Sequence, residues 1–125
     1  MEKEKLSSKF LNCVFVMCGG LLGSLSRYSV SLIVPKKICA VSVVNIVGSF
    51  FVVWFFNSLM PNMPQLQLFA ITGYLGSFTT FSAFSLETMQ MLNSGKYATF
   101  AFNITLNLLG GLTSAFIAWK LFTDS

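Results

Sequence analysis

Long apolar stretches, separated by short turn-forming clusters, dominate the chain. Each stretch has about the 20 apolar helical residues needed to cross a hydrocarbon core of about 30 Å. The separating clusters are Pro35–Lys37, Pro61–Pro64 and Asn93–Lys96, which combine the residues typical of turns. The pattern predicts four membrane-spanning helices, at roughly Phe10–Val34, Ile38–Met60, Leu66–Asn93 and Ala98–Phe122.

The composition supports an all-α integral membrane protein. Of the 125 residues, 54% are hydrophobic and only 10% are charged, whereas a soluble domain carries about 25% charged residues. We therefore expect residues 1–125 to form a single four-helix membrane domain. The net charge is +4, and the basic residues are scattered over the segment ends. No nucleic-acid partner is therefore expected. The sequence contains no nucleotide motif or nucleophile–base pair, and we expect no enzymatic activity.

The positive charges are divided equally between the two sides of the predicted membrane domain. Orientation normally follows a bias in Lys and Arg between the two sides. Without a bias, two interpretations stay open. The chain is oriented by other features, or it has dual topology, inserting both ways and pairing antiparallel with an inverted copy. The two groups of four are Lys3, Lys5, Lys9 and Lys120 on the terminal side, and Arg27, Lys36, Lys37 and Lys96 on the other.

The predicted third span has a polar, glycine-containing centre, Gly73–Glu87. Irregular backbone inside a bilayer is tolerated only where it is buried in protein or lines a polar cavity. Gly73, Gly76 and Ser77 weaken the helix just before Thr79 and Thr80, so we expect a break there. Carbonyls released by a break are hard oxygen ligands for a small alkali cation. The segment is therefore a candidate ion site.

An aromatic pair follows this centre. Phe81 and Phe84 are three residues apart and share a helical face. Aromatic rings are electropositive at their edges, so two ring edges could contact a small anion. Simple packing is the alternative interpretation in a chain with 14 phenylalanines. Ser82 and Ser85 continue the polar character toward the end of the span.

Polar side chains also interrupt the other spans. Asn45 lies in an apolar run and needs hydrogen-bond partners, either as interhelical contact or as an N–H donor facing an anion. Asn103 and Asn107 share one stripe of the fourth span, which fits a helix–helix seam or the wall of a polar track. Arg27 costs a few kcal/mol in a span unless it is paired or snorkelled. It either marks the interface or sits in an aqueous vestibule.

Three motifs together resemble the CrcB/Fluc family of fluoride channels. They are the glycine-rich run ending in Arg-Tyr at Gly19–Tyr28, the asparagine motif at Val44–Phe50 and the long polar motif at Gly73–Glu87. The resemblance covers essentially the whole chain. It implies an antiparallel dual-topology homodimer in a bacterial cell membrane, with two fluoride pathways and a structural Na⁺ at the dimer interface. It implies no organic cofactor.

The same motifs assign roles to individual residues. Asn45 matches the pore asparagine, and Phe81 and Phe84 match the aromatic pair whose ring edges face fluoride. Gly76 and Thr79 match the residues whose backbone carbonyls hold the central Na⁺. The remaining candidates are Ser82, Ser85, Asn103 and Asn107 for the fluoride pathway and Arg27 for the vestibule.

The chain departs from the family pattern at several positions. Ala40 and Val41 replace a frequent Gly-Thr pair, Ala83 replaces a common threonine, and Asn103 takes the place of a fourth-helix tyrosine. Some bacteria carry two such chains. An alternative to the homodimer is therefore a heterodimer with a paralogue, in which this chain is inactive alone.

The sequence thus predicts a channel subunit that exports fluoride passively across the lipid bilayer. One alternative is a small dual-topology multidrug or metabolite exporter. Such a transporter is expected to carry a glutamate in its first helix, whereas this chain has no acidic residue between Glu4 and Glu87. A purely structural membrane subunit is a second alternative. It accounts for the glycines but not for the polar centre of the third span.

Overall fold

The computed structural model describes residues 2–35, 37–59 and 63–123, and all regular structure in these ranges is helical. The predicted all-α class is therefore confirmed. Two of the elements, labelled η, are π-helical, with a wider turn than the α-helix. The elements are α1 (Glu2–Ile33), α2 (Lys37–Trp54), η1 (Phe55–Leu59), α3 (Pro64–Gln67), η2 (Leu68–Leu75), α4 (Gly76–Phe78), α5 (Phe81–Asn93) and α6 (Tyr97–Thr123).

Three helices are long and apolar enough to cross a membrane: Leu6–Ile33, Ala40–Asn57 and Tyr97–Thr123. They correspond to the first, second and fourth predicted spans. The third predicted span is also helical, but it is divided among α3, η2, α4 and α5. None of these pieces is long enough to span a bilayer by itself.

The ends of the elements differ slightly from the prediction. Helix α1 begins at Glu2 rather than Phe10, because the Glu and Lys residues before the apolar run are good helix formers. Helix α3 starts at Pro64, since proline fits the first helical position. Three predicted features lie outside the described residues. They are Lys36 in the turn before the second span, the end of that span at Met60, and Pro61 and Asn62 in the turn after it.

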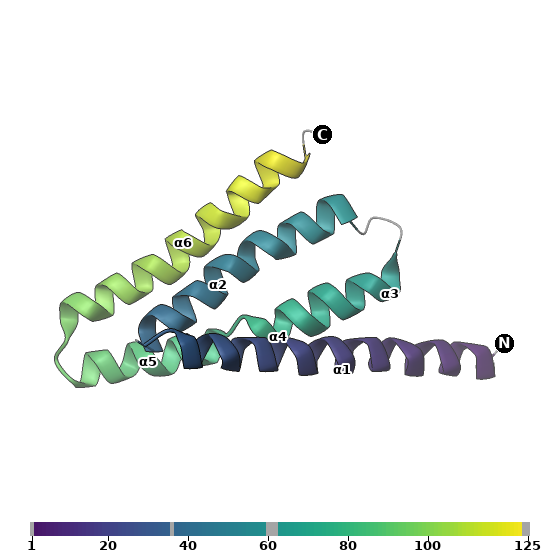
Figure 1. The fold of residues 1–125 in the computed structure, drawn as a ribbon, viewed down its shortest axis with the longest axis horizontal. Helices are drawn as coiled ribbons and strands as arrows, with labels where there is room; N and C mark the ends of the chain where they lie inside the picture. Colours follow the sequence, from purple (N-terminus) through teal and green to yellow (C-terminus); the bar gives the residue numbers. More distant parts are fainter. Residues whose placement is uncertain (1, 36, 60–62, 124–125) are drawn as a thin grey trace.

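The helices form two pairs (Figure 1). Helix α1 lies along α3, η2 and α4, with its main contacts on η2, while α2 lies along α6. The pairs meet around α5, which contacts both α2 and α6. A buried cluster of Val44, Leu75 and Phe78 joins α2 to η2 and α4. This junction positions the candidate site.

Glycines set the close approach of α1 to η2. A Cβ atom built on Gly23 would lie 2.1 Å from the Tyr74 carbonyl oxygen, and one on Gly19 would lie 2.1 Å from that of Phe69. From the opposite helix, a Cβ on Gly73 would lie 2.6 Å from the Val16 carbonyl oxygen. Such small residues are the usual means of close helix packing in membranes.

A tight turn connects α5 to α6. Gly95 has φ +69°, a left-handed conformation that favours glycine. The Gly95 N–H donates to the Leu92 carbonyl at 3.1 Å, and the Lys96 N–H donates to that of Met91 at 3.0 Å. These two bonds form the motif that commonly ends helices, so α6 turns back against α5 and α2.

Candidate functional site at the helix interruption

The helical run from α3 to α5 is interrupted at two threonines. Thr79 has ψ 154°, and Thr80 has φ −150° and ψ 109°. Both are extended conformations open to any residue. The Thr80 hydroxyl then accepts a hydrogen bond from the Ala83 N–H at 3.2 Å, the usual arrangement for a residue that caps the start of a helix. Thr80 thereby begins α5.

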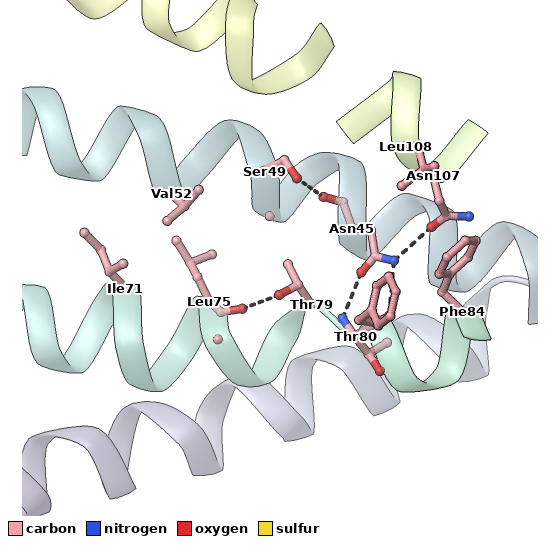
Figure 2. A pocket seen from close by; sticks show the side chains of 13 residues that line it. Asn45, Ser49, Val52, Ile71, Leu75, Thr79, Thr80, Phe84, Asn107 and Leu108 are labelled. Carbon is pink, nitrogen blue, oxygen red and sulfur yellow. Dashed lines mark hydrogen bonds between the residues drawn. The ribbon is translucent and has the colours of Figure 1, made fainter. Parts of the chain in front are cut away.

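Asn45 of α2 holds the backbone of Thr80 from the side (Figure 2). The Thr80 N–H donates to Asn45 Oδ1 at 2.8 Å, and Asn45 Nδ2 donates to the Thr80 carbonyl at 3.3 Å. The same Nδ2 donates to Asn107 Oδ1 at 2.8 Å. A backbone N–H can only donate, so the end of the Asn45 amide that faces the Thr80 N–H is Oδ1. The interhelical interpretation of Asn45 is confirmed, and its contact with an anion stays a prediction.

These side-chain acceptors divert the usual partners of two carbonyls. In a continuous α-helix the N–H groups of Thr80 and Ala83 would donate to the carbonyls of Gly76 and Thr79, respectively. Here they donate to Asn45 Oδ1 and Thr80 Oγ1. Gly76 and Thr79 are the two residues predicted to hold Na⁺ through their carbonyls. Their carbonyl oxygens lose the helical partners that would otherwise compete with a cation.

Gly76 itself does not create the interruption. It has helical torsion angles, φ −61° and ψ −30°. A Cβ atom built on it would lie no closer than 3.6 Å, an ordinary contact, to the Ile71 carbonyl oxygen. The break therefore lies at Thr79 and Thr80, whose backbone is bonded to Asn45 and to the Thr80 hydroxyl, and Gly76 itself stays helical.

A cavity of about 340 Å³ lies between the interruption, α2 and α6. It brings together most of the predicted site residues, from α2, α4, α5 and α6 and from Thr79 between α4 and α5. The rings of Phe81 and Phe84 share one of its walls, with centroids 5.5 Å apart and planes tilted by 55°. Phe84 is 8% exposed and Phe81 is 73% exposed. The predicted site residues that line this cavity are Asn45, Gly76, Thr79, Phe81, Phe84 and Asn107.

A chain of amide hydrogen bonds continues from this cavity into the protein. Asn107 Nδ2 lies 3.0 Å from each of three acceptors, Asn103 Oδ1, the Asn103 carbonyl oxygen and Ser42 Oγ, and donates its two hydrogens among them. Asn103 Nδ2 donates to Thr88 Oγ1 at 2.9 Å, and the Thr88 hydroxyl donates to the Phe84 carbonyl at 2.6 Å. The stripe predicted on the fourth span is thus a seam between α6 and its neighbours.

Three residues predicted for the fluoride pathway lie beside the cavity rather than in its lining. Asn103 is completely buried in the seam. Ser82 lies with its Oγ 3.3 Å from Thr80 Oγ1, and the Ser85 hydroxyl donates to the Phe81 carbonyl at 2.9 Å. A helical hydroxyl bonded to the carbonyl four residues earlier has used its donor locally.

Arg27 lines a second cavity, of about 550 Å³, on the opposite side of Thr80. Its Nε donates to the Ser77 carbonyl at 3.1 Å, near the carbonyl end of the first helical half, where positive charge is favourable. Glu87 lines the same cavity, as do Val41 and Ala83, two of the departures from the family pattern. Thr80 lines both cavities.

Sequence reasoning did not identify three residues of this network: Thr80 as a residue bound through its backbone, Ser42 and Thr88. The available signal was helical spacing. Ser42 precedes Asn45 by three positions, and Thr88 follows Phe84 by four, so each shares a face with a predicted site residue. Within the described ranges, no group of three or more His, Cys, Asp or Glu side chains could hold a metal.

Comparison with known proteins finds a matching family model and several relatives of the chain. Residues 14–119 match the family model described as CrcB-like protein, Camphor Resistance. A Ruminiclostridium cellulolyticum protein named fluoride-specific ion channel FluC is 38% identical, over 90% of this chain and 93% of its own length. Proteins of the same name from Gloeobacter violaceus and Campylobacter jejuni are 40% and 37% identical, over 85% and 90% of this chain and 91% and 98% of their own lengths.

Proposed function

Because the chain belongs to the CrcB-like family, we propose that it is a subunit of a fluoride-selective channel through which fluoride leaves the cytoplasm passively. The observation that carries the proposal is the single cavity that unites Asn45 with the Phe81 and Phe84 rings. The relatives named fluoride-specific ion channels support it. Their family is one of ion channels and not of enzymes.

The cavity offers an anion few and fixed contacts. Asn45 carries two N–H groups on Nδ2, and the contact with the Thr80 carbonyl is the longer of its two bonds, at 3.3 Å. That N–H is the donor most easily shared with an anion. The ring edges of Phe81 and Phe84 supply weak positive potential. Fluoride, as the smallest halide, approaches such fixed groups most closely, so chloride is excluded.

The membrane potential supplies the driving force. Fluoride enters cells as HF and ionises at neutral pH. Moving one negative charge outward through a negative-inside potential of 100 mV is favourable by about 2.3 kcal/mol. A conductive pathway therefore expels fluoride without a coupled reaction.

We place the interrupted segment across the bilayer as the third of four spans in this multi-pass membrane protein. Its irregular backbone at Thr79 and Thr80 is enclosed by α2 and α6 and bonded to Asn45. Such protection is what irregular backbone requires at membrane depth. Thr80 lines both cavities and lies between them.

We assign a structural Na⁺ to the carbonyl oxygens of Gly76 and Thr79. The diversion of their helical donors to Asn45 and Thr80 supports this assignment, because backbone carbonyls suit alkali cations. Two carbonyls from one chain are too few for a complete shell. A second, inverted copy would supply the same pair, and Na⁺ would fix the two copies against each other.

The pathway also calls for a second chain. Phe81 borders the cavity but is 73% exposed, so a partner is needed to close the wall beside it. An antiparallel homodimer meets this need and agrees with the equal division of positive charges. A heterodimer with a paralogue meets it as well, and the loss of hydroxyls at Val41 and Ala83 favours that second assignment.

Ion efflux from liposomes tests the proposal. Purified protein should release fluoride and retain chloride when the membrane potential is clamped with valinomycin and K⁺. Comparable chloride release would overturn the channel assignment. A chain that is silent alone but active when mixed with a paralogue would establish the heterodimer. Silence in both arrangements would exclude a fluoride channel.

A further inference from the structure

We propose that Asn107, Asn103 and Thr88 form, with Asn45, a one-directional chain of hydrogen bonds that acts as a unit and positions both Asn45 and Phe84 at the cavity. The inference rests on the proposed function, because it concerns the same cavity. It assigns Asn103 and Thr88 as positioning residues that reach the cavity only through their neighbours. They do not line it.

Backbone groups fix the direction of this chain at both of its ends. The Thr80 N–H can only donate and takes Asn45 Oδ1, so the donor end of that amide points to Asn107. At the other end, the Phe84 carbonyl can only accept and takes the Thr88 hydroxyl proton. The hydroxyl oxygen is then the acceptor for Asn103 Nδ2. Every link between these ends is therefore oriented the same way.

The links are buried, so water cannot easily replace a missing partner. Asn103 is 0% exposed, and Thr88 and Asn107 are 8% exposed. A buried polar group that loses its partner costs its full desolvation. Reversing a single amide would place two acceptors or two donors face to face. Such a network is expected to contribute more than the sum of its separate bonds.

This order has a consequence at the cavity. With Asn45 Oδ1 held by the Thr80 N–H, Nδ2 is the donor that Asn45, as a residue lining the cavity, can share with an anion. At the far end, the chain holds the α5 turn that carries the Phe84 ring. Thr88 thus affects both contacts of the anion, although two other side chains, Asn103 and Asn107, separate it from Asn45.

Variants of two threonines test the role of the chain in conduction. Thr88→Val removes the hydroxyl and keeps the β-branched shape, and fluoride efflux should fall about five- to tenfold, the effect of one lost buried hydrogen bond. Thr88→Ser keeps the hydroxyl and should restore efflux to near the wild-type rate. Thr105→Val, at an exposed position on α6 between the two asparagines, is the matched control and should leave efflux unchanged.

A second measurement does not depend on conduction. Exchange of the Thr80 amide proton, followed by NMR in micelles, reports directly on its bond to Asn45. Asn103→Leu and Thr88→Val should each accelerate this exchange about five- to tenfold, the same single-bond effect, although neither residue touches Thr80. The double variant should add little to either single change, because one break already interrupts the unit. Thr105→Val should leave the exchange rate as it is.

The two readouts separate the possible failures. Unchanged Thr80 exchange in Asn103→Leu and Thr88→Val would overturn the positioning role, whatever happens to efflux. Additive effects of the two changes would also overturn it, since independent contacts would explain them. If the wild-type protein passes no fluoride while exchange responds as expected, the hydrogen-bonded unit stands and the proposed function fails.

Discussion

At the scale of single residues, Phe81 and Phe84 differ sharply in exposure although they are three positions apart on one helix. Phe84 packs in the interior beside Asn107, whereas Phe81 covers the cavity from the outside. A buried ring has a fixed orientation, and an exposed ring needs a partner to fix it. The two rings therefore contribute to the site in different ways.

Replacing either ring with isoleucine tests the aromatic contacts. Isoleucine keeps bulk and apolarity but lacks the electropositive ring edge. Phe81→Ile and Phe84→Ile should each reduce fluoride efflux from liposomes strongly, by about tenfold or more if one edge contributes about 1.4 kcal/mol. Dimer assembly, checked by size-exclusion chromatography, should persist. Unchanged efflux in both variants would show that the rings only pack.

Substitutions of Thr79 and Gly76, whose carbonyls are proposed to bind Na⁺, are expected to have effects of opposite severity. Thr79→Ala should be mild, about 0.5–1.5 kcal/mol, because its hydroxyl only repeats the backbone bond to the Leu75 carbonyl. If the proposed Na⁺ site joins two chains at Gly76, Gly76→Leu should abolish the thermal stabilisation of the purified protein by Na⁺. Within one chain a Cβ on Gly76 has room, so the damage would come from a partner held close by the shared ion. A Gly76→Leu dimer that still gains stability from Na⁺ would refute that location.

At the scale of the helices, close packing of α1 against η2 depends on glycine. Gly23→Ala would place a methyl group 2.1 Å from the Tyr74 carbonyl oxygen, and overpacking of this kind typically costs about 1–3 kcal/mol. The melting temperature in detergent should fall measurably. Gly20→Ala is the matched control, since its methyl group would meet only the movable Ser77 hydroxyl at 3.2 Å. Equal melting temperatures for the two variants would contradict this account.

Hydropathy alone could predict the helical stretches, because each apolar run is about long enough to cross a membrane and ends at turn-forming residues. The polar centre of the third stretch also located the interruption near Thr79. Its physical cause could not be read locally, since the acceptor for the Thr80 N–H lies 35 residues earlier in the chain. The π-helical turns of η1 and η2 gave no sequence signal.

Prediction of the site depended on motif resemblance more than on periodicity. Asn45, Phe81 and Phe84 meet at one cavity as the motif implied. Ser82 and Ser85 were placed in the pathway because they are polar, but their hydroxyls are engaged next to the cavity. Helical spacing shows which residues share a face. It does not show which hydroxyls have already donated to their own backbone.

At the scale of the whole molecule, large apolar side chains remain exposed along α1 and α6, the surfaces available to lipid and to a second chain. If the functional unit is an antiparallel homodimer, roughly half of the chains should face each way. A C-terminal cysteine tag, probed with impermeant reagents on intact and on opened cells, measures this division. Uniform orientation, together with full fluoride export by this chain alone, would exclude the antiparallel homodimer.

The bond between Thr80 and Asn45 joins two segments that are synthesised at different times. Synthesis proceeds from the N-terminus, so α2 already exists when Thr80 leaves the ribosome. A peptide of residues 64–93 alone lacks the Asn45 acceptor, and its Thr80 N–H is expected to return to the Gly76 carbonyl in a continuous helix. Carbon chemical shifts of Thr79 and Thr80 in micelles would reveal whether it does. In a newly inserted segment the backbone groups of the third span would then stay bonded within one helix until the segment packs against α2. Unassembled chains would therefore not conduct ions.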